Sequence, residues 1–257
     1  MARKTKKQTD NPKVPKGSRW WRWSNLAHLS LNISLPIALL VLVNINLELL
    51  AIIIALFSKW RVFTVRPRHL IANLRANFTD IFVKLGTLAF IIQADTNTAQ
   101  LAWTAWYIIW LTLIKPQSSK IWMGLQAMAG QVIGLSALFQ FSESLPPIMF
   151  LALVWLIATG TARHLLANYE DEWSRVIVLL WGLFVTELAW LSYHWLLVYL
   201  FVPQLVLILA VISYTLASIY DAAQKDTLER SFVRQQAIVA TVTLAAIVML
   251  GDWHGEI

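Results

Sequence analysis

The sequence contains no cysteine, and this absence excludes three kinds of chemistry. Disulfides, thiolate nucleophiles and cysteine-ligated metal sites all need that side chain. Sequence patterns of other enzymes are missing too: there is no P-loop, no GxGxxG, no HExxH and no GxSxG nucleophile elbow. The five histidines are scattered along the chain without the spacing of metal ligands. We therefore predict no bound metal and no cofactor.

Charged residues are also scarce, at 14% of the 257 residues, whereas hydrophobic residues make up 58% and the mean hydropathy is +0.60. A single soluble core of this size cannot bury so much apolar surface. The fourteen tryptophans suit the two interfaces of a bilayer, where an indole ring lies in hydrocarbon and its N–H stays hydrated. The composition therefore predicts an integral membrane protein of the all-α class, a polytopic bundle of transmembrane helices.

Apolar runs recur along the chain and predict about nine spans. We place them at residues 26–45, 46–60, 77–93, 97–115, 121–141, 145–166, 174–195, 196–220 and 234–251. The first two are the weakest, because residues 26–57 form one run that is too long for a single crossing. They form either two short helices that turn at residues 44–46 or a re-entrant hairpin that does not cross the membrane.

Basic residues are distributed unevenly between the loops of this arrangement. The outward loops and the last segment, GDWHGEI, contain no Lys or Arg, whereas twenty of the twenty-one basic residues fall in the inward loops and the first segment. The exception is Lys84. Membrane proteins keep Lys and Arg on the cytoplasmic side, so the pattern predicts a cytoplasmic N-terminus and an external C-terminus. The net charge of +7 then reflects orientation and contact with anionic lipid headgroups, and it does not indicate nucleic-acid binding.

The chain divides by composition into three parts. Residues 1–24 form a basic tail, expected to be disordered, which ends in the segment RWWRWS, an anchor suited to the membrane interface. Residues 25–251 form a single transmembrane helical domain, and residues 252–257 form a short external tail. We expect a multi-pass protein of a prokaryotic cytoplasmic membrane, associated with another membrane protein or with further copies of itself.

Polar residues form one stripe along the helix predicted around residues 77–93. Each residue advances 100° around a helix axis, so steps of four, three, four and three stay on one face. These steps join Asn73, Asn77, Asp80, Lys84 and Thr87. An ionisable side chain this deep in a membrane costs about 2.5–3.5 kcal/mol, so it should face protein or water. Asp80 and Lys84 either satisfy each other along the helix or line a cytoplasm-facing cavity where Lys84 meets an anionic substrate or headgroup.

A shorter polar stripe enters the first helix from the same side. It consists of Asn25, His28 and Asn32, at positions i, i+3 and i+7. The two stripes either share one wet crevice or pack on each other through hydrogen bonds, and such packing is the commoner arrangement. The predicted substrate-binding residues are Lys84, Asp80, Asn77, Asn73, Asn32 and His28.

Glu187 is the other deep charge, and it shares a helix face with His194 nearer the outer surface. A carboxyl group in lipid favours its protonated form, so Glu187 and His194 are the predicted proton relay. The alternative is that Glu187 is a hydrogen-bonded acid that holds two helices together.

Two further motifs indicate helix packing and capping. Gly130 and Gly134 form a GxxxG pattern, which lets another helix approach closely. The acidic run at residues 170–172 precedes a predicted helix, where negative charge complements the helix dipole, so we interpret it as a cap and not as a catalytic cluster.

These features favour a small permease or a transport-complex subunit with a polar, cytoplasm-facing interior around Lys84. The alternative is a membrane scaffold or assembly subunit whose buried polar residues serve helix packing. A membrane enzyme that acts on a lipid-linked substrate ranks third, and it requires acids or histidines that converge with Lys84 in space.

Overall fold

The apolar runs of the sequence fold into helices. A computed structural model of the chain describes residues 19–58, 77–167, 169, 171–192, 198–199 and 202–250. Within these residues the helices are α1 (Arg19–Asn44), α2 (Glu48–Phe57), α5 (Phe78–Gln93), α6 (Asn97–Ile109), α7 (Lys120–Gln140), α8 (Pro147–Leu166), α9 (Ser174–Ser192), α10 (Gln204–Gln224) and α11 (Arg230–Leu250). A π-helical turn, η1 (Trp110–Ile114), continues α6, and a 3-10 turn, η2 (Ser142–Ser144), follows α7. The all-α class is confirmed.

Each of the nine predicted spans overlaps one of these helices, although several bounds differ, and α1 begins at Arg19, within the tail predicted at residues 1–24. The span predicted at residues 196–220 begins late, because β1 (Val198–Tyr199) and β2 (Val202–Pro203) pair in antiparallel fashion before α10 starts. The span predicted at 46–60 is the ten-residue helix α2, which is about 15 Å long at 1.5 Å per residue. Its length is about half of a 30 Å hydrocarbon core.

The turn between α1 and α2 lies where the sequence placed it. Asn46 adopts a left-handed backbone conformation with φ of 59°, which asparagine tolerates better than most residues. The backbone N–H of Asn46 donates to the Val43 carbonyl at 3.0 Å, and that of Leu47 donates to the Leu42 carbonyl at 2.9 Å. The chain therefore reverses tightly, and α2 returns along α1.

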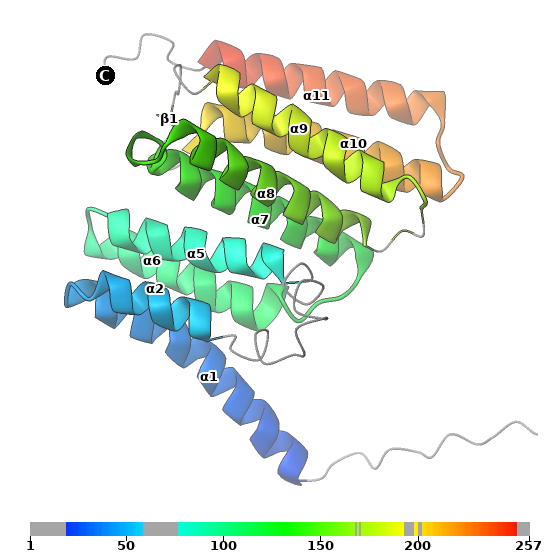
Figure 1. The fold of residues 1–257 in the computed structure, drawn as a ribbon. Helices are drawn as coiled ribbons and strands as arrows, with labels where there is room; N and C mark the ends of the chain where they lie inside the picture. The colour runs from blue at the N-terminus through cyan, green and yellow to red at the C-terminus, as the bar shows by residue number, and fades with distance from the viewer. Residues whose placement is uncertain are drawn as a thin grey trace, which may run out of the picture.

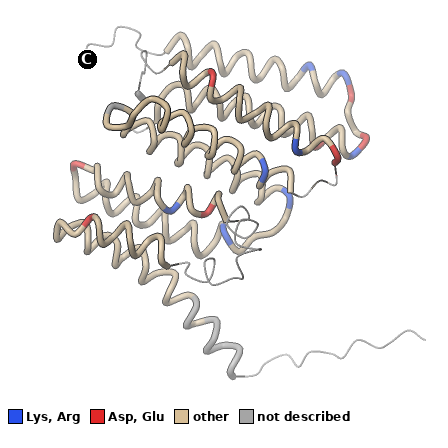
Figure 2. The backbone as a smooth tube through the Cα atoms, viewed as in Figure 1, with Lys and Arg blue, Asp and Glu red and all other residues tan. Residues whose placement is uncertain are grey.

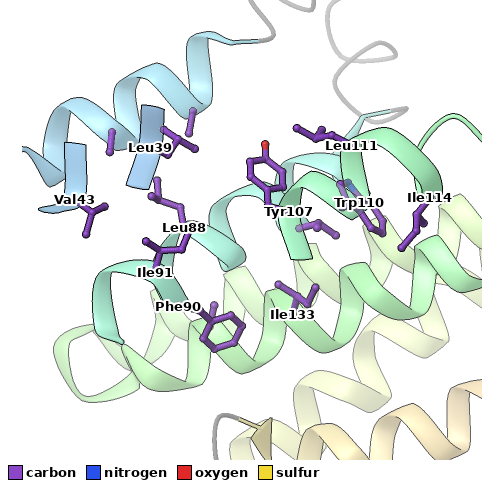
Figure 3. Packing of buried hydrophobic residues seen from close by; sticks show 14 residues of the cluster. Leu39, Val43, Leu88, Phe90, Ile91, Tyr107, Trp110, Leu111, Ile114 and Ile133 are labelled. Carbon is purple, nitrogen blue, oxygen red and sulfur yellow. The ribbon is translucent and has the colours of Figure 1, made fainter. Parts of the chain in front are cut away.

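The helices stack in layers, with α1 and α2 at one edge and α11 at the other, and α7 and α8 between them (Figure 1). Two groups of buried apolar residues hold the layers together. The first lies between α1, α2, α5, α6 with η1, and α7, and Figure 3 shows Leu39, Leu88, Tyr107 and Ile133 among its members. The second lies between α5, α7, α8, α9 and α10. Helices α5 and α7 contribute to both groups and so connect the two halves.

Within the described residues, five helices are long and apolar enough to cross a membrane: α7, α8, α9, α10 and α11. Large apolar side chains are exposed on the outside of this bundle, as expected of a surface that faces lipid. The structure therefore supports a multi-pass membrane protein. Figure 2 shows that the Lys and Arg positions of the described residues gather toward one end of the bundle, whereas Asp and Glu positions occur toward both ends.

Candidate functional site

Lys84 is buried inside the bundle, with only 3% of its surface exposed. Its ammonium group donates to the Ala55 carbonyl at 3.0 Å and to the Ser58 hydroxyl at 2.7 Å. Both acceptors lie at the C-terminal end of α2, where backbone carbonyls lack helical partners and the helix dipole is negative. A cation is therefore the favourable partner for this end of the short helix.

Asp80, one turn before Lys84 in α5, is bound by one residue of η1 and by the residue that directly follows η1. Its Oδ1 accepts a hydrogen bond from the Trp110 indole N–H at 3.1 Å, and its Oδ2 lies 3.1 Å from the Lys115 ammonium. The Asp80 side chain is 11% exposed, whereas that of Lys115 is 37% exposed. The ion pair thus runs from the interior toward the basic end of the bundle.

The π-helical turn η1 brings both partners of Asp80 together. Residues 110 and 115 would point about 140° apart on an α-helix, at 100° per residue. In η1 the backbone N–H of Lys115 instead donates to the carbonyl of Trp110 at 2.9 Å, a bond between residues i and i+5. This wider turn places Lys115 above Trp110, so that one carboxylate receives both side chains.

Pro116 ends the helix directly after the wide turn. Proline has no backbone N–H, so it cannot donate to the helix, and the Lys115 N–H is already used on Trp110. The carbonyl of Leu111 consequently lacks a helical donor, and the amide of Asn32 in α1 donates to it at 3.5 Å. The shorter polar stripe, on α1, is thereby connected through Asn32 to the segment that holds Asp80.

Gln126 in α7 contacts η1 and the loop that follows it. Its amide donates to the carbonyls of Ile114 and Gln117, at 2.8 and 2.9 Å, and so satisfies the end of η1 and the loop after it. Its oxygen lies 3.0 Å from Nε2 of His164 in α8. His164 lies within electrostatic range of Asp80. We call these six residues the Asp80 cluster: Asp80, Lys84, Trp110, Lys115, Gln126 and His164.

The predicted substrate-binding residues are only partly joined in this cluster. Lys84 and Asp80 belong to it, Asn32 reaches its edge, and Asn77 lies half-buried at the N-cap position of α5. Asn73 and the side chain of His28 lie outside the described residues. Sequence reasoning missed Trp110 and Lys115, although Pro116, directly after Lys115, was the signal that the helix ends irregularly there.

Two hydroxyl groups near the cluster, on side chains with no exposed surface, have no hydrogen-bond partner within the described part of the chain. They belong to Thr87 in α5 and Tyr107 in α6, which are both fully buried. The Tyr107 hydroxyl lies within electrostatic range of Asp80. A polar group left in this state costs about 1–3 kcal/mol, so these hydroxyls add unused hydrogen-bonding capacity to the interior.

Of the predicted proton relay, Glu187 and His194, the structure describes only Glu187. Glu187 in α9 is exposed, whereas Lys84 in α5 is buried, and the two helices lie in different layers of the bundle (Figure 1). His194 lies outside the described residues. Glu187 therefore belongs to a different surface from the Asp80 cluster.

Gly130 and Gly134 lie where α7 crosses two neighbours. A Cβ at Gly130 would lie 2.7 Å from Cγ2 of Thr79 in α5 and 3.2 Å from Cγ2 of Thr161 in α8. A Cβ at Gly134 would lie 3.2 Å from Cγ2 of Ile157 and 3.3 Å from Cβ of Phe82. These close contacts position α5, and with it Asp80 and Lys84, against α7.

A second polar group lies at the basic end and joins the loop before α9 to the end of α10. Tyr169 donates to Asp221 at 2.9 Å, and Tyr220 donates to Asp171 at 2.5 Å. Lys225 binds Asp221, and the Lys120 ammonium lies 4.8 Å from the centre of the Tyr169 ring. Asp171 also accepts from the backbone N–H of Trp173 at 2.9 Å, which fits the predicted capping role.

The pKa of the Tyr169 hydroxyl should lie well above that of an ordinary tyrosine. Burial raises the pKa of Tyr169 to about 12, and its hydrogen bond to Asp221 adds to the rise. The neutral hydroxyl is the favoured form in the fold, so its contribution to stability is complete below pH 10 and is lost as the pH rises through about 12. The difference in tyrosinate absorbance between the wild type and Tyr169→Phe measures this titration. A midpoint near 10 would show that the contact with Asp221 does not form.

Comparisons with protein-family models, with curated proteins and with solved structures found no match.

Proposed function

We propose that the chain is a small permease or a transport-complex subunit, with the Asp80 cluster as its polar interior. In this proposal the basic end of the bundle faces the cytoplasm, as the positive-inside rule requires. The observation that carries the proposal is that the C-terminal end of the short helix α2 binds the buried ammonium of Lys84. In membrane transporters, discontinuous helices that end at mid-membrane depth commonly form the binding sites for ions and substrates.

Three features of the site support transport. The Asp80–Lys115 pair extends from the interior toward the basic end, so the buried carboxylate is connected to a partly exposed cation there. A π-helical turn, which is frequent at functional sites, holds that pair. Helix α2 contributes only the buried residues Ala51 and Ala55, and these small side chains allow it to move with little loss of packing. Movement of α2 away from Lys84 would expose an ammonium group to an anionic substrate.

The absence of cysteine makes a direct test available. In the Lys84→Cys variant, a small, water-soluble, thiol-reactive compound that carries an ammonium group should reach the new thiol from the cytoplasmic side. Its reaction restores a positive charge at position 84. Lys115→Cys serves as the exposed control, because the Lys115 side chain is already 37% exposed. Transport predicts slow but complete reaction of Lys84→Cys in folded protein, since the site opens only part of the time. Reaction only after denaturation would contradict a transport site at Lys84.

A membrane scaffold is the second candidate, and the contacts themselves favour it. Lys84, Asp80 and Gln126 each bind a group on a neighbouring helix or turn, which is what helix packing requires. The same reagent distinguishes the two functions. A scaffold does not need water to reach position 84, so it predicts no reaction of Lys84→Cys in folded protein. For a membrane enzyme, His164 is the histidine that converges on Asp80, but its Nε2 atom is bound to Gln126.

A further inference from the structure

Helix α9 has two different faces. Gly182, Val185 and Ala189 are buried, and a Cβ on Gly182 would lie 2.3 Å from Cγ2 of Thr159 in α8. The opposite face, roughly 150° around the axis at 100° per residue, is uncovered. Its central line is formed by Val176, Leu180, Leu183, Glu187 and Trp190, which we call the α9 seam, and Leu179, Phe184 and Leu191 are exposed on either side of this line.

The α9 seam has the spacing of a two-stranded helix contact. Its residues step by four, three, four and three, which is the 3.5-residue repeat of paired helices wound around each other. Its four apolar side chains are between 44% and 60% exposed. Lipid could cover these apolar residues, so the repeat alone does not call for a protein partner.

Glu187 is the residue in the seam whose polar group finds no hydrogen-bond partner in the hydrocarbon of a lipid bilayer. It is exposed, and it makes no hydrogen bond or ion pair within the described part of the chain. It lies five residues before the end of α9 at Ser192, or about 7.5 Å along the axis. Acidic residues within membrane helices almost always face other protein or water and pair with a polar group.

We propose that the α9 seam is the contact between two copies of this chain, arranged around a twofold axis perpendicular to the membrane. Copies of one chain insert in the same direction, so equal residues lie at equal depth. Leu180 and Leu183 would then interdigitate with their counterparts, and the two Glu187 side chains would meet near the axis.

The polar groups of the seam are complementary to themselves. Glu187 offers a carboxyl group, and Trp190, one turn away and 50% exposed, offers an indole N–H, which can only donate. Across a twofold axis each carboxyl group can accept from Trp190 of the second copy, and the two carboxyl groups can share a proton. A single polar residue at such a position also fixes the register and the number of helices in the contact.

Cysteine cross-linking tests the proposal in the native membrane, because the chain has no cysteine of its own. Leu183→Cys should form a disulfide-linked dimer of the full chain on mild oxidation. Two matched controls are Leu216→Cys in α10 and Val242→Cys in α11, which are 52% and 64% exposed in the single chain. These controls should remain monomeric under the same conditions.

Changes at Glu187 then test the polar contact. In liposomes, with dimer measured by energy transfer between labelled copies, Glu187→Ala should weaken association about 3- to 30-fold, the effect of losing an interhelical hydrogen bond in a membrane. Glu187→Gln keeps hydrogen-bonding capacity and should stay within about 3-fold of the wild type. Equal cross-linking at residues 183, 216 and 242 would overturn the proposal. So would a wild-type chain that stays monomeric, or one that cross-links at residue 183 only to a different protein.

Discussion

Replacing Asp80 with alanine is expected to lower the free energy of unfolding by about 3 kcal/mol, in the range found when one partner of a buried ion pair is removed. The loss is large because the Trp110 indole, in a side chain that is 1% exposed, would keep an N–H without an acceptor. The cost stays at the lower end of that range because Lys115 is 37% exposed and can turn to water. Unfolding of the purified protein in detergent by increasing denaturant measures the change.

Asp80→Asn is the matched control for this result. The amide oxygen can still accept from Trp110, and only the charge opposite Lys115 is lost, so we expect a loss of about 1 kcal/mol. Equal losses for the two variants would show that the Trp110 hydrogen bond contributes nothing. A wild-type level of stability for Asp80→Ala would contradict the geometry of the whole cluster.

Valine at Gly130 is expected to destabilise the bundle by about 3 kcal/mol, because overpacking a filled interior forces side chains and backbone to move. The first added carbon alone would lie 2.7 Å from the Thr79 methyl group and 3.2 Å from the Thr161 methyl group. Both threonines are buried, at 3% and 1% exposure, so neither has space to withdraw. Since Thr79 directly precedes Asp80, we also expect the reactivity of Lys84→Cys to rise in this background.

Gly124→Ala in the same helix provides the comparison. The nearest atom to its added carbon is Cδ1 of Leu165 at 3.7 Å, an ordinary contact. Alanine favours a helix over glycine by about 1 kcal/mol, so this variant should be as stable as the wild type or slightly more stable. If thermal unfolding in detergent gave the same midpoint for Gly130→Val and Gly124→Ala, the close contact between α5 and α7 would be wrong.

The positions of the helices could be predicted from the sequence because each one is an apolar run bounded by polar or charged residues. The turn at Asn46 was also predictable, because asparagine interrupts an apolar run and tolerates a left-handed backbone. The late start of α10 was not, since residues 196–203 are as apolar as a helix and only Pro203 marks the change. Hydropathy measures burial in lipid, and it does not distinguish a helix from a short extended pair.

Sequence reasoning could predict which residues of one helix share a polar face, but not which residues of other helices they contact. The spacing of Asp80 and Lys84 showed that one face of α5 is polar, and both side chains are indeed buried. Their contacts with Ala55, Trp110 and Lys115 depend on how distant helices pack, which periodicity within one helix does not report. Lys115 was counted only among the basic residues of the inward loops, and helical periodicity gives no sign of the π-helical turn that directs it onto Asp80.

In the proposed topology the helices cross a bilayer with the basic end of the bundle in the cytoplasm. Because the chain has no cysteine, Asp95→Cys and Lys225→Cys report on the two ends of the bundle separately. Labelling of intact cells with a membrane-impermeant maleimide should modify Asp95→Cys at once and Lys225→Cys only after the membrane is opened. Modification of both residues from the same side would contradict the threading of the chain and, with it, a cytoplasm-facing site at Lys84.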